Sequence, residues 1–184
     1  MNEEVINQVI LVNEFDEEIG TMEKLEAHQK GLLHRAFSVF VFNSKKELLL
    51  QKRALGKYHS EGLWTNTCCS HPSPNETIED AAVRRLQEEM GYTCSVVKTF
   101  SFIYDVALDN ELIEHELDHV VIGISDENPV LNPAEASDFD WKTIDTIKND
   151  MDLFPENYTS WFKIILNVHY DKLVNALNLA YESL

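Results

Sequence analysis

Two short apolar segments, separated by a polar tetrapeptide, constrain the fold of this chain more than any other feature. Residues 35–43 read RAFSVFVFN and residues 47–53 read ELLLQKR, and both are rich in residues that favour β-strands. The connecting residues, Asn43-Ser44-Lys45-Lys46, are typical of a hairpin turn. The sequence therefore predicts an antiparallel strand pair and a fold that contains a β-sheet.

The remaining segments predict more strands early in the chain and helices late. Strand-type runs occupy residues 8–13, 63–69, 94–106 and 112–125, whereas residues 22–31 suggest a short helix or a loop. Helical patterns occupy residues 144–150 and 157–183. This order of elements predicts an α+β (mixed α/β) fold, in which a sandwich of mixed sheets is flanked by helices.

One helix has clear signals at both ends. Thr77 is a suitable N-cap for a helix over Ile78–Met90, and Gly91 is a suitable C-terminal stop. The apolar residues follow a helical stripe, at Ile78, Ala81, Ala82, Leu86 and Met90. Glu88 and Glu89 project from the last turn.

Length and composition limit the class of protein. A chain of 184 residues predicts one domain, residues 1–184, with a C-terminal helix. It has no apolar run of 18 residues and no signal-peptide pattern in Met-Asn-Glu-Glu. Its cysteine count of three is odd, which is a poor basis for disulfides. Together these features predict a cytoplasmic protein. A net charge of −17 argues against nucleic acid or an anionic membrane as a partner.

The positive charges are unevenly distributed. Eight of the fifteen lysines and arginines lie between Lys24 and Lys57. Such a concentration in an acidic protein suggests a site for a compact anion, although a solvated basic face would give the same pattern.

A second pattern suggests a metal site. In a strand, Glu114 and Glu116 share one face while His115 points to the other, and a divalent cation would relieve the repulsion between the two carboxylates. His28, His34 and His71 could complete a site for zinc or manganese. A solvated acidic edge and separate structural histidines remain the alternative.

The segment from Ser70 to Gly91 resembles the Nudix box, a loop–helix–loop that brings glutamates and magnesium to a diphosphate. The matching residues are Glu76, Arg84, Leu86, Glu88, Glu89 and Gly91. Two positions depart from that pattern, because Ser70 replaces the opening glycine and Arg85 replaces a glutamate. Such a helix could still hold a magnesium-diphosphate, with Glu89 for the metal and Arg85 for the anion.

Residues 62–72, GLWTNTCCSHP, narrow the family further. Together with Arg53-Ala54-Leu55, Glu114-x-Glu116 and Trp161, they resemble the type I isopentenyl-diphosphate delta-isomerases over about residues 8–161. That resemblance implies the conversion of isopentenyl diphosphate to dimethylallyl diphosphate in isoprenoid precursor biosynthesis. One alkene carbon is protonated, and a proton leaves from the opposite face.

The resemblance also implies roles for individual residues. Cys69, Glu116 and Tyr104 match the catalytic residues. One Zn²⁺, Mn²⁺ or Mg²⁺ would be bound by His28, His34, His71, Glu114 and Glu116. A second ion, Mg²⁺ carried by the diphosphate substrate, would meet Glu89 and the carbonyl of Cys69. The residues expected to contact the substrate are Lys24, Arg53, Lys57, Arg85, Cys69 and Trp161. The protein is expected to be a monomer or a weak homodimer.

The physical chemistry of the reaction suits these residues. An alkene is a weak base, so a positioned acid is needed, and the carbocation has to be kept from water. Trp161 could face the cation, and the unperturbed thiol pKa of about 8.5 would let Cys69 exchange a proton near neutral pH. Since neighbouring strand residues face opposite sides, Cys69 would enter the pocket and Cys68 would be buried.

Several other residues match no such role. Trp64 is expected in the core and Cys94 in a structural position, and no role follows for His59, His119 or His169. Two other functions remain open. A Nudix hydrolase that cleaves a diphosphate would need a glutamate where Arg85 stands. A non-catalytic binding protein would have no use for a proton-transfer group such as Cys69.

Overall fold

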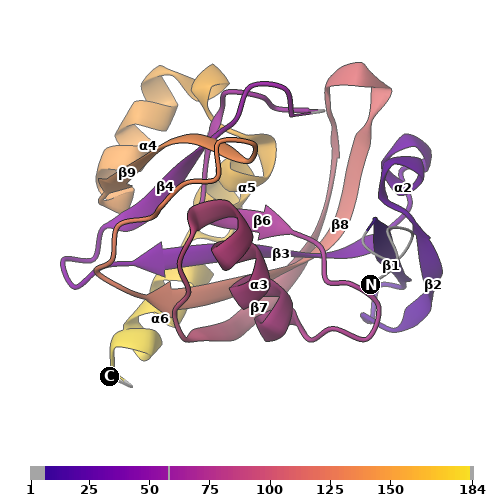
Figure 1. The fold of residues 1–184 in the computed structure, drawn as a ribbon, viewed down its shortest axis with the longest axis horizontal. Coiled ribbons are helices and arrows are strands. Elements are labelled where there is room, and N and C mark those ends of the chain that lie inside the picture. The colour runs from indigo at the N-terminus through magenta and orange to yellow at the C-terminus, as the bar shows by residue number, and fades with distance from the viewer. Residues whose placement is uncertain (1–6, 58, 183–184) are drawn as a thin grey trace.

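The computed structural model describes residues 7–57 and 59–182, and strands dominate its first two thirds (Figure 1). The strands are β1 Gln8–Val12, β2 Glu18–Glu23, β3 His34–Phe42, β4 Leu48–Arg53, β5 Trp64–Thr65, β6 Cys68–Ser70, β7 Val96–Ala107, β8 Ile113–Ile124 and β9 Ala136–Lys142. The helices are α2 Lys24–Lys30, α3 Ile78–Met90, α4 Ile144–Leu153, α5 Ser160–Val168 and α6 Tyr170–Glu182, with 3₁₀ turns at Asp109–Glu111 and Pro155–Asn157. None of the described helices is both long and apolar enough to cross a membrane.

Strand β3 lies at the centre of the sheet. It runs parallel to β8, from the pair His34–Glu116 to the pair Phe42–Ile124, and antiparallel to β6 on its other side. Beyond β8 lies β7, and β1 and β2 continue from the start of β3. β4 touches β3 only at the end of the hairpin and then pairs with β5 and β9. The sheet is therefore mixed, as the sequence predicts.

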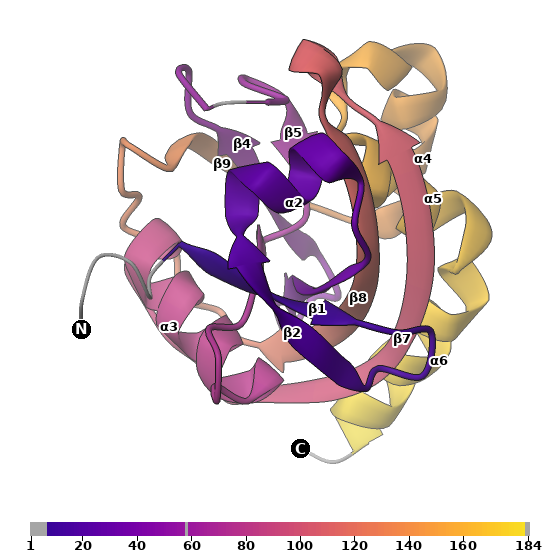
Figure 2. The same cartoon turned by 90° about the vertical axis from the view of Figure 1, so that its right-hand side faces the viewer.

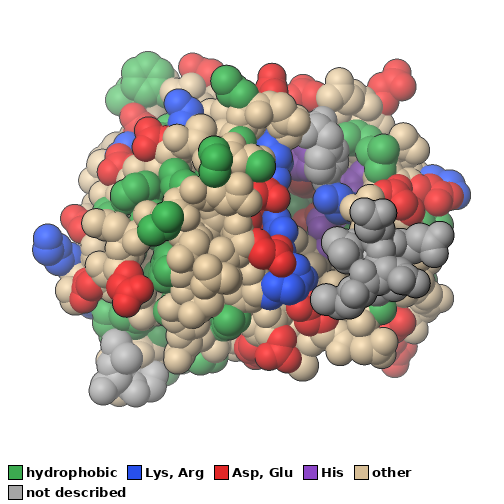
Figure 3. Space-filling view, viewed as in Figure 1, with side chains coloured by type: hydrophobic (Ala, Val, Ile, Leu, Met, Phe, Trp, Pro, Cys, Tyr) green, Lys and Arg blue, Asp and Glu red, His purple; other side chains and the backbone are tan. Residues whose placement is uncertain are grey.

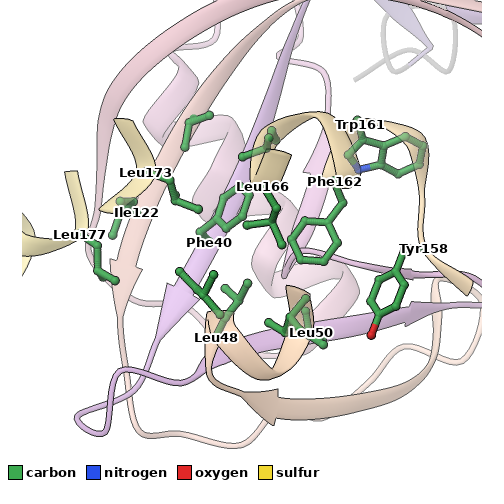
Figure 4. Packing of buried hydrophobic residues seen from close by; sticks show 14 of the residues in the cluster. Phe40, Leu48, Leu50, Ile122, Tyr158, Trp161, Phe162, Leu166, Leu173 and Leu177 are labelled. Atoms are coloured by element: carbon green, nitrogen blue, oxygen red, sulfur yellow. The ribbon is translucent and has the colours of Figure 1, made fainter. Parts of the chain in front are cut away.

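Helices cover both faces of this sheet (Figure 2). The larger core lies between the sheet and helices α4, α5 and α6. Figure 4 shows its packing, in which Phe40 meets Phe162, Leu166 and Leu173. The smaller core lies on the opposite face, where α3 packs on β3 and β6. The α+β fold class is confirmed, with helices on both sides of one connected sheet.

Helix α3 has the bounds and caps that the sequence predicts. The Asp80 backbone N–H donates to Thr77 Oγ1 over 3.1 Å, and Gly91 ends the helix with φ of 70°. A side chain at Gly91 would place its Cβ 2.1 Å from the carbonyl oxygen of Val130, so the position requires glycine. The C-terminal end of α3 is thereby held close to the loop that precedes β9.

Four details differ from the sequence-based prediction. The strand predicted over 63–69 is two short strands, because side chains of Asn66 and Thr67 bond the backbone of β3 and β4 in place of a regular ladder. The predicted C-terminal helix is two helices that meet at His169. Its predicted end at Ser183 lies outside the described residues, and so does the N-terminal Met-Asn-Glu-Glu. β2 and β9 were not predicted, because neither has a strongly apolar pattern. Each is an outer strand that pairs with another strand along one edge only.

Candidate active site

The site and the larger core share one face of the same two strands. Along β3 the side chains on this face change from Phe42 and Phe40 to Ser38 and His34. Along β8 they change in the same direction, from Ile122 and Val120 to Asp118, Glu116 and Glu114. Because strand residues alternate between faces, the polar side chains gather at one end of the core.

A pocket at this polar end collects nearly all the residues predicted from the sequence. Twelve of them line it: Lys24, His28, Arg53, Lys57, Cys69, His71, Arg85, Glu89, Tyr104, Glu114, Glu116 and Trp161. The thirteenth, His34, is fully buried next to His28 and His71. Figure 3 shows histidine side chains in a hollow whose rim carries both basic and acidic groups.

Three histidines and one carboxylate form a compact group in this pocket. His28 comes from α2, His34 from β3, His71 from the end of β6 and Glu116 from β8, and one ligand atom of each lies within 4.8 Å of the others. Glu116 Oε1 is 3.0 Å from His71 Nε2 and 3.4 Å from His34 Nε2. The Nδ1 atoms of His28 and His34 each lie 2.7 Å from a backbone carbonyl, so each Nδ1–H donates there and each Nε2 turns its lone pair inward.

The protonation states also suit a metal ion. Burial lowers the pKa of His71 to about 3 and lowers that of His28 below its ordinary value. Burial alone would raise the pKa of Glu116, but its contacts with His34 and His71 outweigh burial and leave it well below the usual range. Neutral imidazoles and an ionised carboxylate are the forms that bind divalent cations. Among the described residues, the buried His34 Nε2 has no hydrogen-bond partner, which is a position a metal would fill.

Glu114 lies beside this group but faces a different way. The Tyr104 hydroxyl lies 2.6 Å from Glu116 Oε2 and 3.2 Å from Glu114 Oε2. The other oxygen of Glu114 is 3.8 Å from His59 Nε2. Burial, together with the charge of Glu116, raises the pKa of Glu114 well above its usual value. Both carboxylates are buried while His115 bonds the backbone of Gly31, so the predicted alternation along β8 is confirmed.

The thiol of Cys69 enters the pocket from β6. It donates a hydrogen bond to Asn66 Oδ1 over 3.0 Å and accepts one from Trp161 Nε1 over 3.1 Å. Ser38 Oγ lies 3.7 Å away and donates to the buried carboxylate of Asp118. Burial, and secondarily the charge of Asp118, raises the pKa of Cys69 to about 12, so the thiol keeps its proton at neutral pH and the expected unperturbed pKa of about 8.5 is wrong. Cys68 is fully buried on the opposite face, within the α3 core.

Cations form the other side of the pocket. Arg85 donates to Glu89 Oε1 over 2.6 Å and lies 3.4 Å from Glu135, which also binds Lys57. Burial lowers the pKa of Lys24, and the nearby charges of Lys57 and Arg85 lower it further. These three cations come from distant segments and line one pocket, where they could contact the same anion. Glu135 accompanies them through its ion pairs with Lys57 and Arg85.

Arg53 joins the cationic side to Trp161. Its guanidinium donates to the carbonyls of Ser60 and His59 over 3.1 Å each and lies 5.4 Å from the centre of the Trp161 ring. Of the eight cations between Lys24 and Lys57, only Lys24, Arg53 and Lys57 line the pocket. Arg35, for example, pairs with Asp16. The concentration of lysines and arginines between Lys24 and Lys57 therefore predicts the anion site only in part.

Sequence reasoning missed several pocket residues. His59 lines the pocket beside Glu114 and Trp161, although no role was expected for it. Ser38, which also lines the pocket, and its partner Asp118 were hidden in apolar strand runs. Glu135, which pairs with the pocket cations Lys57 and Arg85, was hidden in a loop. The period of two along β3 and β8, extended from His34 and Glu116, would have identified Ser38 and Asp118.

Comparison with known proteins agrees with this fold and identifies a family. A family model described as NUDIX domain matches residues 32–162. The crystal structure of DR0079 from Deinococcus radiodurans aligns with a TM-score of 0.66 at 22% identity, covering 79% of this chain and 89% of that one. The MutT protein of Methanosarcina mazei Go1 aligns with a TM-score of 0.55 at 18% identity, covering 64% and 81%. At these identities the similarity shows the fold alone.

Sequence relatives are much closer. The isopentenyl-diphosphate Delta-isomerase of Pectobacterium atrosepticum is 52% identical over 159 residues, 86% of this chain and 89% of its own length. The isopentenyl-diphosphate Delta-isomerase 2 of Aromatoleum aromaticum is 53% identical over 161 residues, 88% and 85% of the two chains. The chain belongs to the Nudix domain family and, within it, to the isopentenyl-diphosphate Delta-isomerases. The family expected from the sequence is confirmed.

Proposed function

We infer that this chain catalyses the conversion of isopentenyl diphosphate to dimethylallyl diphosphate, and we propose that Cys69 and Glu116 exchange the two protons. One observation carries the residue assignment. Cys69 on β6 and Glu116 on β8 belong to the two strands that flank β3, and both side chains line the same pocket. A substrate in this pocket would have a proton-transfer group on each side, as an allylic isomerisation requires.

The proton balance of the reaction is simple. One group adds a proton to an alkene carbon of the substrate, and the resulting tertiary carbocation loses a proton to the other group. Tyr104, which lies 2.6 Å from Glu116, holds the carboxylate in place and connects it to Glu114. The number of protons on substrate and product is the same, so the enzyme needs no external oxidant or reductant.

Trp161 would face the carbocation. Its indole is 3% exposed and lies in the pocket wall, where desolvation strengthens a cation–π attraction to roughly 2 kcal/mol or more. The bonds from its N–H to Cys69 and Thr65 fix the orientation of the ring. A buried ring also keeps water away from an intermediate that water would convert to an alcohol.

The cationic side of the pocket would bind the diphosphate. Lys24, Arg53, Lys57 and Arg85 are the donors, and Glu89 and the carbonyl of Cys69 are the proposed ligands of a Mg²⁺ that arrives with the substrate. Mg²⁺ suits this role because it is usually bound by few carboxylates together with substrate phosphates. In the described structure Arg85 is already paired with Glu89 and Glu135, which keeps its side chain oriented before substrate binds.

The residues of the histidine group fit a resident divalent ion. We propose that His28, His34, His71 and Glu116, with Glu114 beside them, hold one Zn²⁺, Mn²⁺ or Mg²⁺. When bound, such an ion would supply positive charge that orients Glu116 and keeps the carboxylate in its ionised form. The three nitrogens and one oxygen within 4.8 Å favour zinc or manganese over magnesium.

The proposal is tested by incubating the purified protein with isopentenyl diphosphate and magnesium in D₂O. We expect dimethylallyl diphosphate that carries solvent deuterium, detected by NMR, and no release of phosphate or pyrophosphate. Release of phosphate without the allylic isomer would favour a Nudix hydrolase instead. Arg85 argues against that alternative, since a hydrolase would need a carboxylate at this position of α3.

A further inference from the structure

Thr65 is a fully buried hydroxyl at the junction of three chain segments that meet beside Cys69. Its side chain is 1% exposed and belongs to the short strand β5. Thr65 Oγ1 accepts hydrogen bonds from Trp161 Nε1 over 2.9 Å and from Thr159 Oγ1 over 3.1 Å. It donates its own hydrogen to Asn66 Oδ1 over 2.9 Å. With one bond donated and two accepted, the hydroxyl uses its full capacity.

The next residue in this network has only one possible orientation. Asn66 Nδ2 donates to the carbonyls of Val39 and Cys68, over 3.1 Å in each case. Because the NH₂ group is bound to these carbonyls, the amide oxygen has to face Thr65 and the thiol of Cys69. Asn66 Oδ1 therefore accepts from both Thr65 Oγ1 and Cys69 Sγ.

Trp161 closes the network from the other side. Its indole N–H is shared between Thr65 Oγ1 at 2.9 Å and Cys69 Sγ at 3.1 Å. Cys69 Sγ is thus held by an acceptor, Asn66, and a donor, Trp161, and each of these partners also bonds Thr65. Thr65 Oγ1 is 3.9 Å from the sulfur, so its effect on the thiol passes through its two neighbours.

We propose that Thr65 is a positioning residue that sets the relative placement of the Cys69 thiol and the Trp161 ring. Trp161 lies on α5, nearly a hundred residues away in sequence, and it is the proposed contact of the carbocation. The hydroxyl of Thr65 thus couples the group that exchanges a proton to the ring that stabilises the resulting charge. This proposal rests on the proposed function, because it takes Cys69 as a proton-transfer group.

The decisive substitution is Thr65→Val, which replaces the hydroxyl with a methyl group of similar size. The indole N–H then has only the sulfur as a partner, and Asn66 Oδ1 loses one of its two donors. We expect kcat to fall on the order of 10- to 100-fold, because small misplacements of reacting groups have effects of this size. KM should stay within about threefold, since Thr65 lies away from the cationic side, and Thr65→Ser should restore most of kcat.

Thr67→Val is the matched control. Thr67 is equally buried in the same segment, and its hydroxyl also makes two hydrogen bonds, to Leu49 O and Val41 N, but it contacts neither Cys69 nor Trp161. Both valine variants should lower the unfolding temperature, and only Thr65→Val should lower kcat. If Thr65→Val does not fold, Thr65→Ala replaces it in the same comparison.

Two results would overturn the proposal. One is a Thr65→Val enzyme with kcat within threefold of wild type, and the other is an equal loss of kcat in Thr67→Val. Failure of the proposed function would be separate, because the wild-type protein would then form no dimethylallyl diphosphate. Failure of the Cys69 assignment would appear as full isomerase activity in Cys69→Ala, whatever the result at Thr65.

Discussion

Strands β3 and β8 each have an apolar half and a polar half on the same face, and the two halves serve different purposes. In the apolar half, Phe40 and Val120 pack under α5 and α6. In the polar half, His34 and Glu116 meet in the metal-binding group. Backbone pairing between β3 and β8 is continuous through both halves. The backbone pairing is thus the same whether the side chains are apolar or polar. We therefore expect that stability and activity can be changed separately.

The boundary between the halves is a single polar contact. Ser38 Oγ donates to Asp118 over 2.8 Å, between Phe40 on one side and His34 on the other. Burial, followed by the charge of Glu116, raises the pKa of Asp118 to about 8. Polar groups of this kind add little to folding unless all their bonds are made, so the polar half is expected to contribute less to stability than the apolar half.

The largest expected effect separates the two faces of β6. Cys69→Ala should lower kcat by about 10²- to 10⁴-fold, the usual contribution of a positioned proton-transfer group. Cys68→Ala should leave kcat close to wild type, because Cys68 is buried against α3 and does not line the pocket. Steady-state kinetics of the two purified variants provide the measurement. Loss of activity in Cys68→Ala alone would show that the register of β6 is wrong.

The second prediction compares two neighbours on the pocket face of β3. Phe40→Ala should lower the free energy of unfolding by roughly 3–5 kcal/mol, because a fully buried ring is lost from the core. Ser38→Ala should cost about 1–3 kcal/mol, since Asp118 loses its hydrogen bond, and it should also lower kcat through its contact with Cys69. Urea unfolding and kinetics on both variants test this division.

A folded Phe40→Ala enzyme should keep its kcat at low temperature. If Phe40→Ala lowered kcat more than Ser38→Ala did, the two halves would not be separable. Circular dichroism at the assay temperature shows whether each variant is folded.

The same division explains what the sequence could predict. Runs of strand-favouring residues predict β3, β7 and β8, and the alternation of side chains along a strand places Glu114 and Glu116 on one face. Caps at Thr77 and Gly91 give both ends of α3. These are local signals, and the structure agrees with them closely.

Contacts between residues that are distant in sequence leave no such local signal. His59 enters the pocket because Arg53 bonds the backbone of its loop, and Glu135 pairs with Arg85 because the loop before β9 bonds the backbone at the end of α3. The split between β5 and β6 depends on side chains that bond neighbouring strands. The resemblance to a known family supplied the pocket residues, whereas the sequence pattern alone supplied only the pair of glutamates and a set of histidines.

The third prediction concerns the metal. Adding Zn²⁺ or Mn²⁺ to metal-free protein at 100 times its dissociation constant should stabilise the fold by about 2.7 kcal/mol. At roughly 2–4 °C per kcal/mol for a chain of this size, the unfolding temperature should rise by about 5–10 °C. His34→Ala should abolish this rise, because it removes a buried ligand of the proposed site.

His169→Ala is the control for this measurement. The His169 ring packs 4.3 Å from the Phe102 ring, away from the histidine group, so its loss should lower the basal unfolding temperature and preserve the rise with metal. An equal rise in His34→Ala would place the ion elsewhere.

The smallest effect is expected outside both halves, at the start of α3. Glu76 accepts two hydrogen bonds from Arg84, over 2.7 Å each, and one from the backbone of Ser73. Burial alone would raise the pKa of Glu76, but these bonds outweigh it and leave the pKa below its usual value. Glu76→Gln should therefore lower the stability at neutral pH by less than about 1 kcal/mol and leave kcat unchanged.

The pH dependence gives this small effect a definite sign. A carboxylate with a depressed pKa in the folded state stabilises the fold above its unfolded pKa, about 4.3 for glutamate. That contribution is lost as the pH falls through the folded value. The difference in unfolding free energy between wild type and Glu76→Gln should thus shrink from pH 6 towards pH 3, measured by urea unfolding at each pH. A difference that grew on acidification would mean that Arg84 does not hold Glu76 in its ionised form, and that stability in this region depends on the packing of α3 alone.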